Sequence, residues 1–212
     1  MKKVFFTLSL ALISLLGTAQ KFEVTPLVGY VFGSSMNFYE GEVRFDDNVN
    51  FGARIGFKPT TNTIVEFVYS GENTNAYWEP YSYWAGDIHA RKFPVNINYF
   101  MIGVQQERML SNDKLYGFSG INLGMIYTNS LEQEINDLYN FAVGIDLGLK
   151  IHLTEKVGVR IQTNLNMPLY FQGLGFYAGV GSGGTSSGLT LNSGTYFVQF
   201  GFSGGVYFML GD

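Results

Sequence analysis

The sequence predicts an all-β fold, a closed up-and-down antiparallel barrel of eight strands, and three observations support it. Apolar and polar residues alternate with a period of two from residue 21 onward. The connections between the alternating segments are short and long in turn. Aromatic residues make up 17% of the chain and charged residues only 14%, whereas soluble domains carry about 25% charged residues. This apolar surface must be covered, yet beyond residues 1–19 no apolar run is long enough for a transmembrane helix.

The first residues have the pattern of a secretory signal peptide. Two lysines after the initiating methionine precede the apolar run Val4–Leu16, and Gly17-Thr18-Ala19 supplies the small residues that a signal peptidase reads. A membrane-anchoring helix is the alternative, but the run is short and ends in a cleavage pattern. We therefore expect a cleaved signal peptide over 1–19 and one barrel domain over 20–212.

Composition excludes several classes of partner and cofactor. The chain has no cysteine, so neither a lipid anchor on a terminal cysteine nor a disulfide is possible. The formal charge is −4, and it becomes −6 once Lys2 and Lys3 are removed with the signal peptide. Neither a basic patch nor a nucleic-acid motif is present, so we expect no nucleic-acid partner. We also expect no cofactor and no resident metal.

The alternation places eight strands along the chain. A strand puts such apolar residues on one face, whereas a helix would spread them around its axis. The second, sixth, seventh and eighth segments alternate cleanly, as in Phe141 to Ile151, and the others are less regular. In the fourth segment the apolar residues Val95 and Ile97 have odd numbers, whereas Phe100 and Ile102 have even numbers, so they would lie on opposite faces of a regular strand. Either a β-bulge near Tyr99 brings them to one face, or one of the two sets is assigned to the wrong face. The expected strands are 22–33, 47–58, 62–73, 93–107, 114–128, 139–152, 156–170 and 195–209.

The lengths of the connections predict an orientation. Three are short and four are long, so with an even number of strands all short turns and both termini lie at one end. Transmembrane barrels show short periplasmic turns and long external loops, and each strand has the roughly 9–11 residues needed to cross a bilayer. We therefore expect extracellular long loops. The short connections are 59–61, 108–113 and 153–155, and the long ones are 34–46, 74–92, 129–138 and 171–194.

The two faces of the strands decide between a membrane barrel and a soluble one. A soluble carrier of the lipocalin type would alternate in the same way but needs charged residues on its outer face. Here the polar face is mostly Gly, Asn, Gln and Ser, and the other face is Val, Ile, Leu and Phe. We expect the apolar face to contact lipid. Aromatic residues that fit interfacial girdles are Tyr30, Phe32, Tyr69, Phe93, Tyr127, Phe141, Tyr170, Tyr196 and Phe197 at the long-loop end, with Phe22, Phe57 and Phe208 at the other.

Charges on the polar face predict a network inside the barrel. A turn centred on Thr60 places Arg54 opposite Glu66, and the turn at 153–155 makes Asp146 and Arg160 diagonal neighbours. Buried charges need partners because an unpaired one is costly. The expected lumen charge network consists of Arg54, Glu66, Asp146, Lys150 and Arg160. We expect it to fill the barrel as a polar core, and a functional gate is the alternative.

The sequence gives weaker indications of a catalytic site, a metal site or a partner surface than it gives of the fold. His152 lies at a short turn and His89 in a long loop, and neither has an ordered serine partner. Acidic residues in the first loop (Glu40, Glu42, Asp46 and Asp47) could bind a calcium ion through their oxygens. They lack the spacing of an EF-hand, and acidic loop residues usually face water. The second loop is rich in aromatics, which are enriched at interaction surfaces, although an extended girdle or packing over the barrel mouth is the simpler explanation of them. These residues are Tyr77, Trp78, Tyr81, Tyr83 and Trp84.

The chain resembles the small outer-membrane barrels of the OmpX and OmpA-transmembrane type, and more particularly the PorT-like "outer membrane protein beta-barrel domain" group. The resemblance covers about residues 20–212. It rests on the signal peptide, the eight strands, the loop asymmetry and a last strand with Phe200, Phe202 and Phe208. It implies insertion into the outer membrane of a Gram-negative bacterium with the help of the barrel-assembly machinery. The chain departs from the pattern by ending in Leu210-Gly211-Asp212 rather than in an aromatic residue.

Three functions remain open from the sequence. The first is a non-enzymatic integral barrel with a structural role or a surface role toward an envelope protein partner. The second is a narrow channel or a conduit for a small hydrophobic ligand, favoured by small residues on the lumen face. The third is a lipid A-modifying enzyme, for which no catalytic residues are apparent. The lumen glycines are Gly52, Gly56, Gly144, Gly148, Gly158, Gly201 and Gly205.

Overall fold

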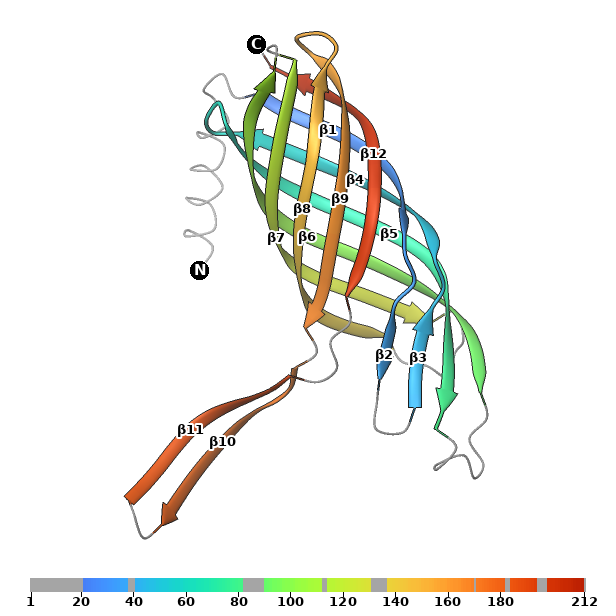
Figure 1. Ribbon diagram of the computed structural model, residues 1–212, viewed down its shortest axis with the longest axis vertical. Coiled ribbons are helices and arrows are strands. Elements are labelled where there is room, and N and C mark those ends of the chain that lie inside the picture. The colour runs from blue at the N-terminus through green and yellow to red at the C-terminus, as the bar shows by residue number, and fades with distance from the viewer. Residues whose placement is uncertain are drawn as a thin grey trace, which may run out of the picture.

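The computed structural model is an antiparallel β-barrel (Figure 1). It describes residues 21–37, 41–81, 90–111, 114–130, 137–169, 171–181, 184–193 and 198–211. The predicted signal peptide therefore lies outside the described residues. The strands are β1 (Lys21–Val31), β2 (Ser35–Asn37), β3 (Gly41–Phe45), β4 (Asn48–Lys58), β5 (Thr63–Pro80), β6 (Arg91–Ser111), β7 (Leu115–Ser130), β8 (Leu138–His152), β9 (Val157–Leu169), β10 (Phe171–Gly181), β11 (Gly184–Ser193) and β12 (Gln199–Leu210).

Eight of these strands close into a ring. Hydrogen bonds connect β5, β4, β1, β12, β9, β8, β7 and β6 in this order, and β6 pairs with β5 again. The first and last strands of the ring, β1 and β12, meet antiparallel and close it. This confirms the predicted closed antiparallel barrel and its eight strands. Closure leaves no unpaired edge in the ring, which a barrel in hydrocarbon requires. Among the described residues, no helix has the length and apolar character to cross a membrane.

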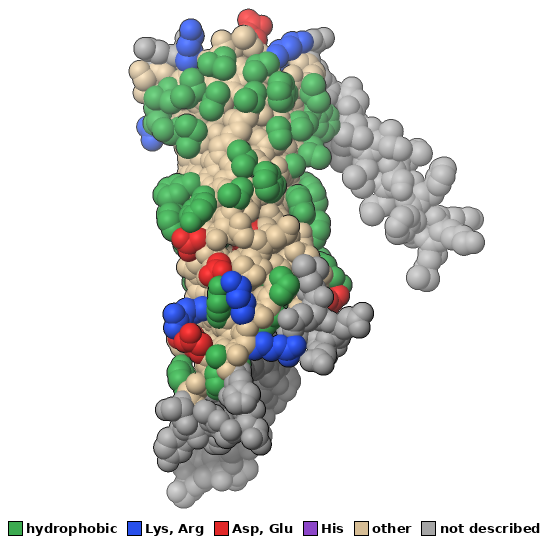
Figure 2. All heavy atoms as spheres, turned by 90° about the vertical axis from the view of Figure 1, so that its right-hand side faces the viewer, with side chains coloured by type: hydrophobic (Ala, Val, Ile, Leu, Met, Phe, Trp, Pro, Cys, Tyr) green, Lys and Arg blue, Asp and Glu red, His purple; other side chains and the backbone are tan. Residues whose placement is uncertain are grey.

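The polarity of the barrel is inverted over the half nearer the short turns. Large hydrophobic side chains are exposed there, with Phe51 63% and Ile102 64% accessible, while Arg160 and Lys150 are 0% accessible. Figure 2 shows hydrophobic side chains spread over this half, with charged groups at its rim and over the opposite half. We call the exposed hydrophobic residues of β1, β4–β9 and β12 in this half the apolar belt. Monomeric soluble proteins rarely expose an apolar patch larger than a few hundred Å².

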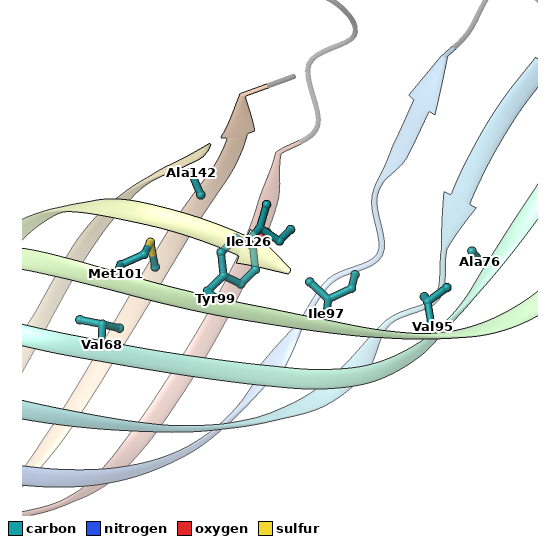
Figure 3. Packing of buried hydrophobic residues seen from close by; sticks show 8 residues of the cluster. All are labelled: Val68, Ala76, Val95, Ile97, Tyr99, Met101, Ile126 and Ala142. Atoms are coloured by element: carbon teal, nitrogen blue, oxygen red, sulfur yellow. The ribbon is translucent and has the colours of Figure 1, made fainter. Parts of the chain in front are cut away.

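Where β5 and β6 continue toward the long loops, they have the opposite, ordinary polarity. Beyond Tyr69 the outward positions of β5 are polar, as at Asn73 and Asn75, and Asn96 and Asn98 occupy the outward positions of β6. Hydrophobic side chains point inward at this level and form a core (Figure 3). Both faces of β5 and β6 thus exchange polarity near the paired residues Tyr69 and Phe100, as expected where a barrel leaves lipid for water. The core consists of Val68, Ala76, Val95, Ile97, Tyr99, Met101, Ile126 and Ala142.

The core explains the two phases of the fourth predicted strand. The pairing of β6 with β5 and β7 runs without interruption past Tyr99, and its one irregularity lies between Met109 and Ser111. The β-bulge expected as one alternative near Tyr99 is therefore absent. Both phases are apolar because Val95 and Ile97 pack in the core, whereas Phe100 and Ile102 lie in the apolar belt.

Three of the expected long loops contain regular structure. β5 continues to Pro80 and β6 begins at Arg91, so much of the expected loop 74–92 is a strand extension. β2 and β3 form a hairpin within the expected loop 34–46, and β3 pairs with β5. β10 and β11 pair with each other within 171–194. We call β2, β3 and the parts of β5 and β6 beyond Tyr69 and Phe100 the strand extension.

Candidate functional site: the polar lumen and its two ends

Arg54 of β4 is at the centre of the first group of buried ion pairs. Its Nη1 lies 2.7 Å from Glu66 Oε2, and its Nη2 lies 2.6 Å from Asp146 Oδ2 across the lumen. The Asn122 amide donates to the same Asp146 oxygen over 2.6 Å. All four residues are buried. One arginine therefore connects the neighbouring strands β4 and β5 with β8, which lies across the ring.

Arg160 of β9 anchors the second group. Its Nη1 lies 2.7 Å from Glu66 Oε1, its Nη2 donates to Gln105 Oε1 over 2.7 Å, and its Nε donates to Gln162 Oε1 over 2.6 Å. The guanidinium carbon lies 4.4 Å from the centroid of the Phe118 ring. Each nitrogen of this guanidinium has a partner, so a full charge is accommodated without water at a fully buried position.

Lys150 continues the network toward the short turns. Its ammonium lies 2.5 Å from Glu23 Oε1 and 2.7 Å from Glu107 Oε1. The ammonium of Lys58, nearer the rim, lies 2.7 Å from Glu107 Oε2. Arg160 Nη1 is 3.7 Å from Glu23 Oε1, which joins this group to the rest. Four carboxylates thus balance four cations, namely Glu23, Glu66, Glu107 and Asp146 against Arg54, Lys58, Lys150 and Arg160.

The structure brings together the five predicted lumen residues, but with different pairings. Gly56, not Arg54, stands opposite Glu66, because the turn after β4 is longer than expected and the register moves by two residues. A shift of two keeps both side chains on the inner face, so their ion pair still forms. Asp146 stands opposite Asn164, and Arg160 opposite Lys150. The expected diagonal contact between Asp146 and Arg160 is wrong for the same reason.

Three charged members of the network are absent from the prediction. Glu23 alternates with the apolar residues Phe22 and Val24, so the pattern of β1 could have revealed it. Glu107 lies on β6, where apolar residues occupy both alternating sets of positions. The sequence of β6 therefore does not show which of its faces is polar. Lys58 lies at the end of β4 and resembles an ordinary turn lysine in sequence.

The lumen beside Arg54 has little free volume. A cavity of about 20 Å³ lies between Arg54, Asp146 and Asn164, and one water needs about 10–15 Å³. Neighbouring rings fill the space that two of the lumen glycines leave. A Cβ at Gly148 would lie 2.5 Å from Phe118, and a Cβ at Gly158 would lie 2.2 Å from the Tyr207 hydroxyl.

A vestibule opens at the short-turn end. It has a volume of about 850 Å³ and includes Lys58 and Glu107 in its lining. His152 also lines it, with its ring 4.7 Å from the Tyr116 centroid and 5.5 Å from that of Tyr207. The Lys58–Glu107 pair thus stands between the vestibule and the buried network.

The aromatic residues of the predicted interaction surface belong to the strand extension as far as they are described. Tyr77 faces outward beside Lys92, whose ammonium donates to its hydroxyl and lies 4.5 Å from its ring centroid. Trp78 packs over Gly41 of β3. The Tyr81 hydroxyl donates to Asn37 of β2 over 3.1 Å. The contacts of Trp78 and Tyr81 hold the β2–β3 hairpin in place, whereas that of Tyr77 joins β5 to β6. Tyr83 and Trp84 lie outside the described residues.

The acidic residues of the first expected loop have protein partners. Asp47 accepts hydrogen bonds from the Gly33 amide (2.7 Å) and the Tyr30 hydroxyl (2.9 Å), and these bonds, the amide first, hold the pKa of its carboxyl below the usual value. Glu42 lies 3.7 Å from Arg44. Glu40 and His89 lie outside the described residues. Within the part of the chain that the structure describes, no group of three His, Cys, Asp or Glu residues could hold a metal ion.

An eight-stranded antiparallel ring with an apolar exterior and a charged interior is the architecture of the small outer-membrane β-barrels. A scan against protein-family models gives no match, and no curated protein matches the chain. Solved structures do match in fold. The class of protein that the sequence resembles, a small β-barrel of the outer-membrane type, is therefore confirmed at the level of architecture.

Three solved structures illustrate the likeness. The outer membrane protein OprG from Pseudomonas aeruginosa is 12% identical, with 92% of this chain and 97% of that chain covered and a TM-score of 0.61. Neisserial surface protein A is 10% identical, with 88% and 96% covered and a TM-score of 0.55. The outer membrane protein AlkL in lipid bilayers is 13% identical, with 91% and 90% covered and a TM-score of 0.50. At these identities the likeness concerns the fold alone.

Proposed function

We propose that this protein is a non-enzymatic integral barrel of a bacterial outer membrane whose strand extension serves as a surface for an envelope partner. The observation that carries the membrane location is the inverted polarity of one half of the barrel. Its exterior exposes hydrophobic side chains while its interior holds four carboxylates and four cations. Acyl chains stabilise such an exterior, and water does not.

Export and orientation belong to the same proposal. Residues 1–19 would direct secretion and be cleaved, and the barrel-assembly machinery would insert the remainder. The short turns would face the periplasm and the strand extension the cell exterior. The polar outer face of the extension supports its exposure to water, since Asn73, Asn75 and Asn96 occupy outward positions.

The strand extension is the best candidate for a partner surface. Part of the hydrophobic core lies within it, and Trp78 and Tyr81 fix its hairpin, so its outer face is ordered rather than a mobile loop. The exposed pair Arg44–Glu79 (2.9 Å) and the ring of Tyr77 give this face charge and aromatic area. Ordered surfaces lose less conformational entropy on binding than mobile loops do.

A photo-crosslinking amino acid tests the partner surface in living cells. Placed at Tyr77, it should give discrete protein adducts, whereas the same group at Phe51 in the apolar belt should give none. Adducts from Phe51 alone, or from neither position, would contradict a partner surface on the extension.

The rival function is a narrow conduit, and the vestibule of about 850 Å³ favours it. The buried network argues against it, because each of Arg54, Lys150 and Arg160 is held by carboxylates across the lumen. Eight-stranded barrels are generally only wide enough for their own side chains.

Planar-bilayer recording decides between the two functions. We expect no steady single-channel steps from the inserted, folded protein, since the ion pairs would have to separate for ions to pass. Reproducible unitary steps from the folded wild-type protein would overturn the structural role and establish a conduit.

A further inference from the structure

The apolar belt is interrupted on the outer face of β5, β6 and β7 near the short turns. In this half of the barrel the outward residues of β8, β9 and β12 are hydrophobic, as at Leu147, Ile161 and Val206. On the three interrupted strands polar or small residues replace most of them, although the exposed Leu110 of β6 remains hydrophobic. We call these outward residues, together with one turn residue, the polar notch: Asn62, Thr63, Gln106, Arg108, Gly117 and Ser119.

The polar notch is a hollow and not only a polar stripe. A cavity of about 540 Å³ lies against Gln106, Arg108, Gly117 and Ser119. Leu110 also lines the cavity, and its side chain packs over Gly117, 3.0 Å from where a Cβ of that glycine would be. The Gln106 amide donates to the Thr63 hydroxyl over 2.8 Å, which fixes one wall.

Arg108 makes this hollow suitable for an anion. Its side chain is exposed, and among the described residues no ion pair is found for it, whereas Glu107 beside it points inward to Lys58 and Lys150. Phosphate is the anion that an arginine at a membrane surface meets most often. Immediately above the notch, Val104 and Ile121 are exposed members of the apolar belt.

The apolar belt is also shorter at this point. The outward hydrophobic residues of β7 run over about 20 Å, from Ile121 to Tyr127, whereas those of β8 cover almost the whole strand, about 40 Å from Tyr139 to Ile151. A bilayer accommodates a short hydrophobic run by thinning or by drawing its polar groups inward. Lipid headgroups would then reach deeper beside β6 and β7 than elsewhere around the barrel.

We propose that the polar notch binds the phosphate headgroup of a phospholipid of the surrounding bilayer, with Arg108 as the anion ligand and the acyl chains along Val104 and Ile121. The inference rests on the membrane location proposed above. Gln106 and Ser119 are the neighbouring polar groups that offer hydrogen bonds to the headgroup.

Native mass spectrometry of the full protein in mild detergent tests the site. The probes are dioleoyl phosphatidylglycerol and dioleoylglycerol, which share acyl chains and differ in the phosphate. We expect retained phosphatidylglycerol, little dioleoylglycerol, and about fivefold weaker retention in Arg108→Gln, as one interfacial cation contributes about 1 kcal/mol. Lys114→Gln removes a cation from the same end without touching the notch, so it should bind like wild type.

A second variant separates the possible occupants. Gln106→Leu with Ser119→Leu restores the hydrophobic run and should also reduce phosphatidylglycerol retention. Equal retention of both probes, or no effect of Arg108→Gln, would overturn the site. A dimer mass abolished by the double variant would assign the notch to a second copy instead and would equally overturn it. If the protein stays monomeric in water without amphiphile, the membrane location itself fails, which is a different result.

Discussion

At the scale of the residue, the barrel depends on charges that have no access to water. Glu66 is the carboxylate that both buried arginines share, with Arg54 and Arg160 each 2.7 Å from one of its oxygens. Removal of one partner from a buried network is costly because it leaves the other charges uncompensated. The contribution of Glu66 to stability therefore depends on the buried charges that it neutralises more than on its own burial.

Replacement Glu66→Gln should lower the free energy of unfolding by about 3–5 kcal/mol, because two buried arginines lose their common carboxylate. Urea unfolding in lipid vesicles, followed by tryptophan fluorescence, measures the loss. The matched control is Glu79→Gln, whose pair with Arg44 has the same kind of geometry at 2.9 Å but is exposed, at 55% for both side chains. It should cost less than about 1 kcal/mol. Equal losses in the two variants would contradict the buried network.

The sequence identified these residues better than it identified their contacts. Alternation in β4, β8 and β9 was enough to place Arg54, Asp146 and Arg160 on the inner face. Their partners depend on the register, and the register depends on turns whose exact length the alternation does not encode. Contacts across the barrel, such as that between Arg54 and Asp146, also require the closure of the ring, which no local pattern contains.

At the scale of the element, the seam between β1 and β12 closes the barrel (Figure 1). The ladder has a gap between Val24 and Val28, where Pro26 has no N–H to donate. Gly205 faces this gap, and a Cβ there would lie 1.9 Å from the Pro26 carbonyl oxygen. Only a residue without a side chain allows the two backbones to approach in this way.

Gly205→Ala should therefore destabilise the barrel by about 1–3 kcal/mol through a forced backbone shift at the seam. Gly204→Ala is the neighbouring control, because its nearest contact would be an ordinary 3.5 Å to the Arg160 carbonyl oxygen. The temperature at which the compact band converts to the unfolded band in gel electrophoresis compares the two. A Gly205→Ala protein as heat-resistant as Gly204→Ala would show that the seam does not need the glycine.

Elements were predictable from the sequence where their outer face is apolar and not where it is polar. The eight ring strands have a hydrophobic outer face that contrasts with the inner one, so period-two alternation revealed them. In the strand extension, residues such as Asn73 and Asn75 face outward and resemble a loop in composition. The same change of polarity hid the core residues Val95 and Ile97 as an apparent phase error.

At the scale of the whole molecule, two opposite polarities share one continuous barrel. The half nearer the short turns is hydrophobic outside and charged inside, and the continuation of β5 and β6 is polar outside with a hydrophobic core (Figures 2 and 3). The change occurs near Tyr69 and Phe100, whose ring centroids lie 5.2 Å apart. A single solvent does not suit both halves, so the molecule is built for a boundary between lipid and water.

Site-directed spin labelling measures which face contacts lipid, and the absence of native cysteine makes single labels specific. In lipid vesicles, labels at Phe51→Cys and Ile102→Cys should collide readily with oxygen and poorly with a water-soluble nickel chelate. Labels at Asn73→Cys and Asn96→Cys should show the reverse. If the first two labels were as accessible to the nickel chelate as the second two, the apolar belt would face water and the membrane account would be wrong.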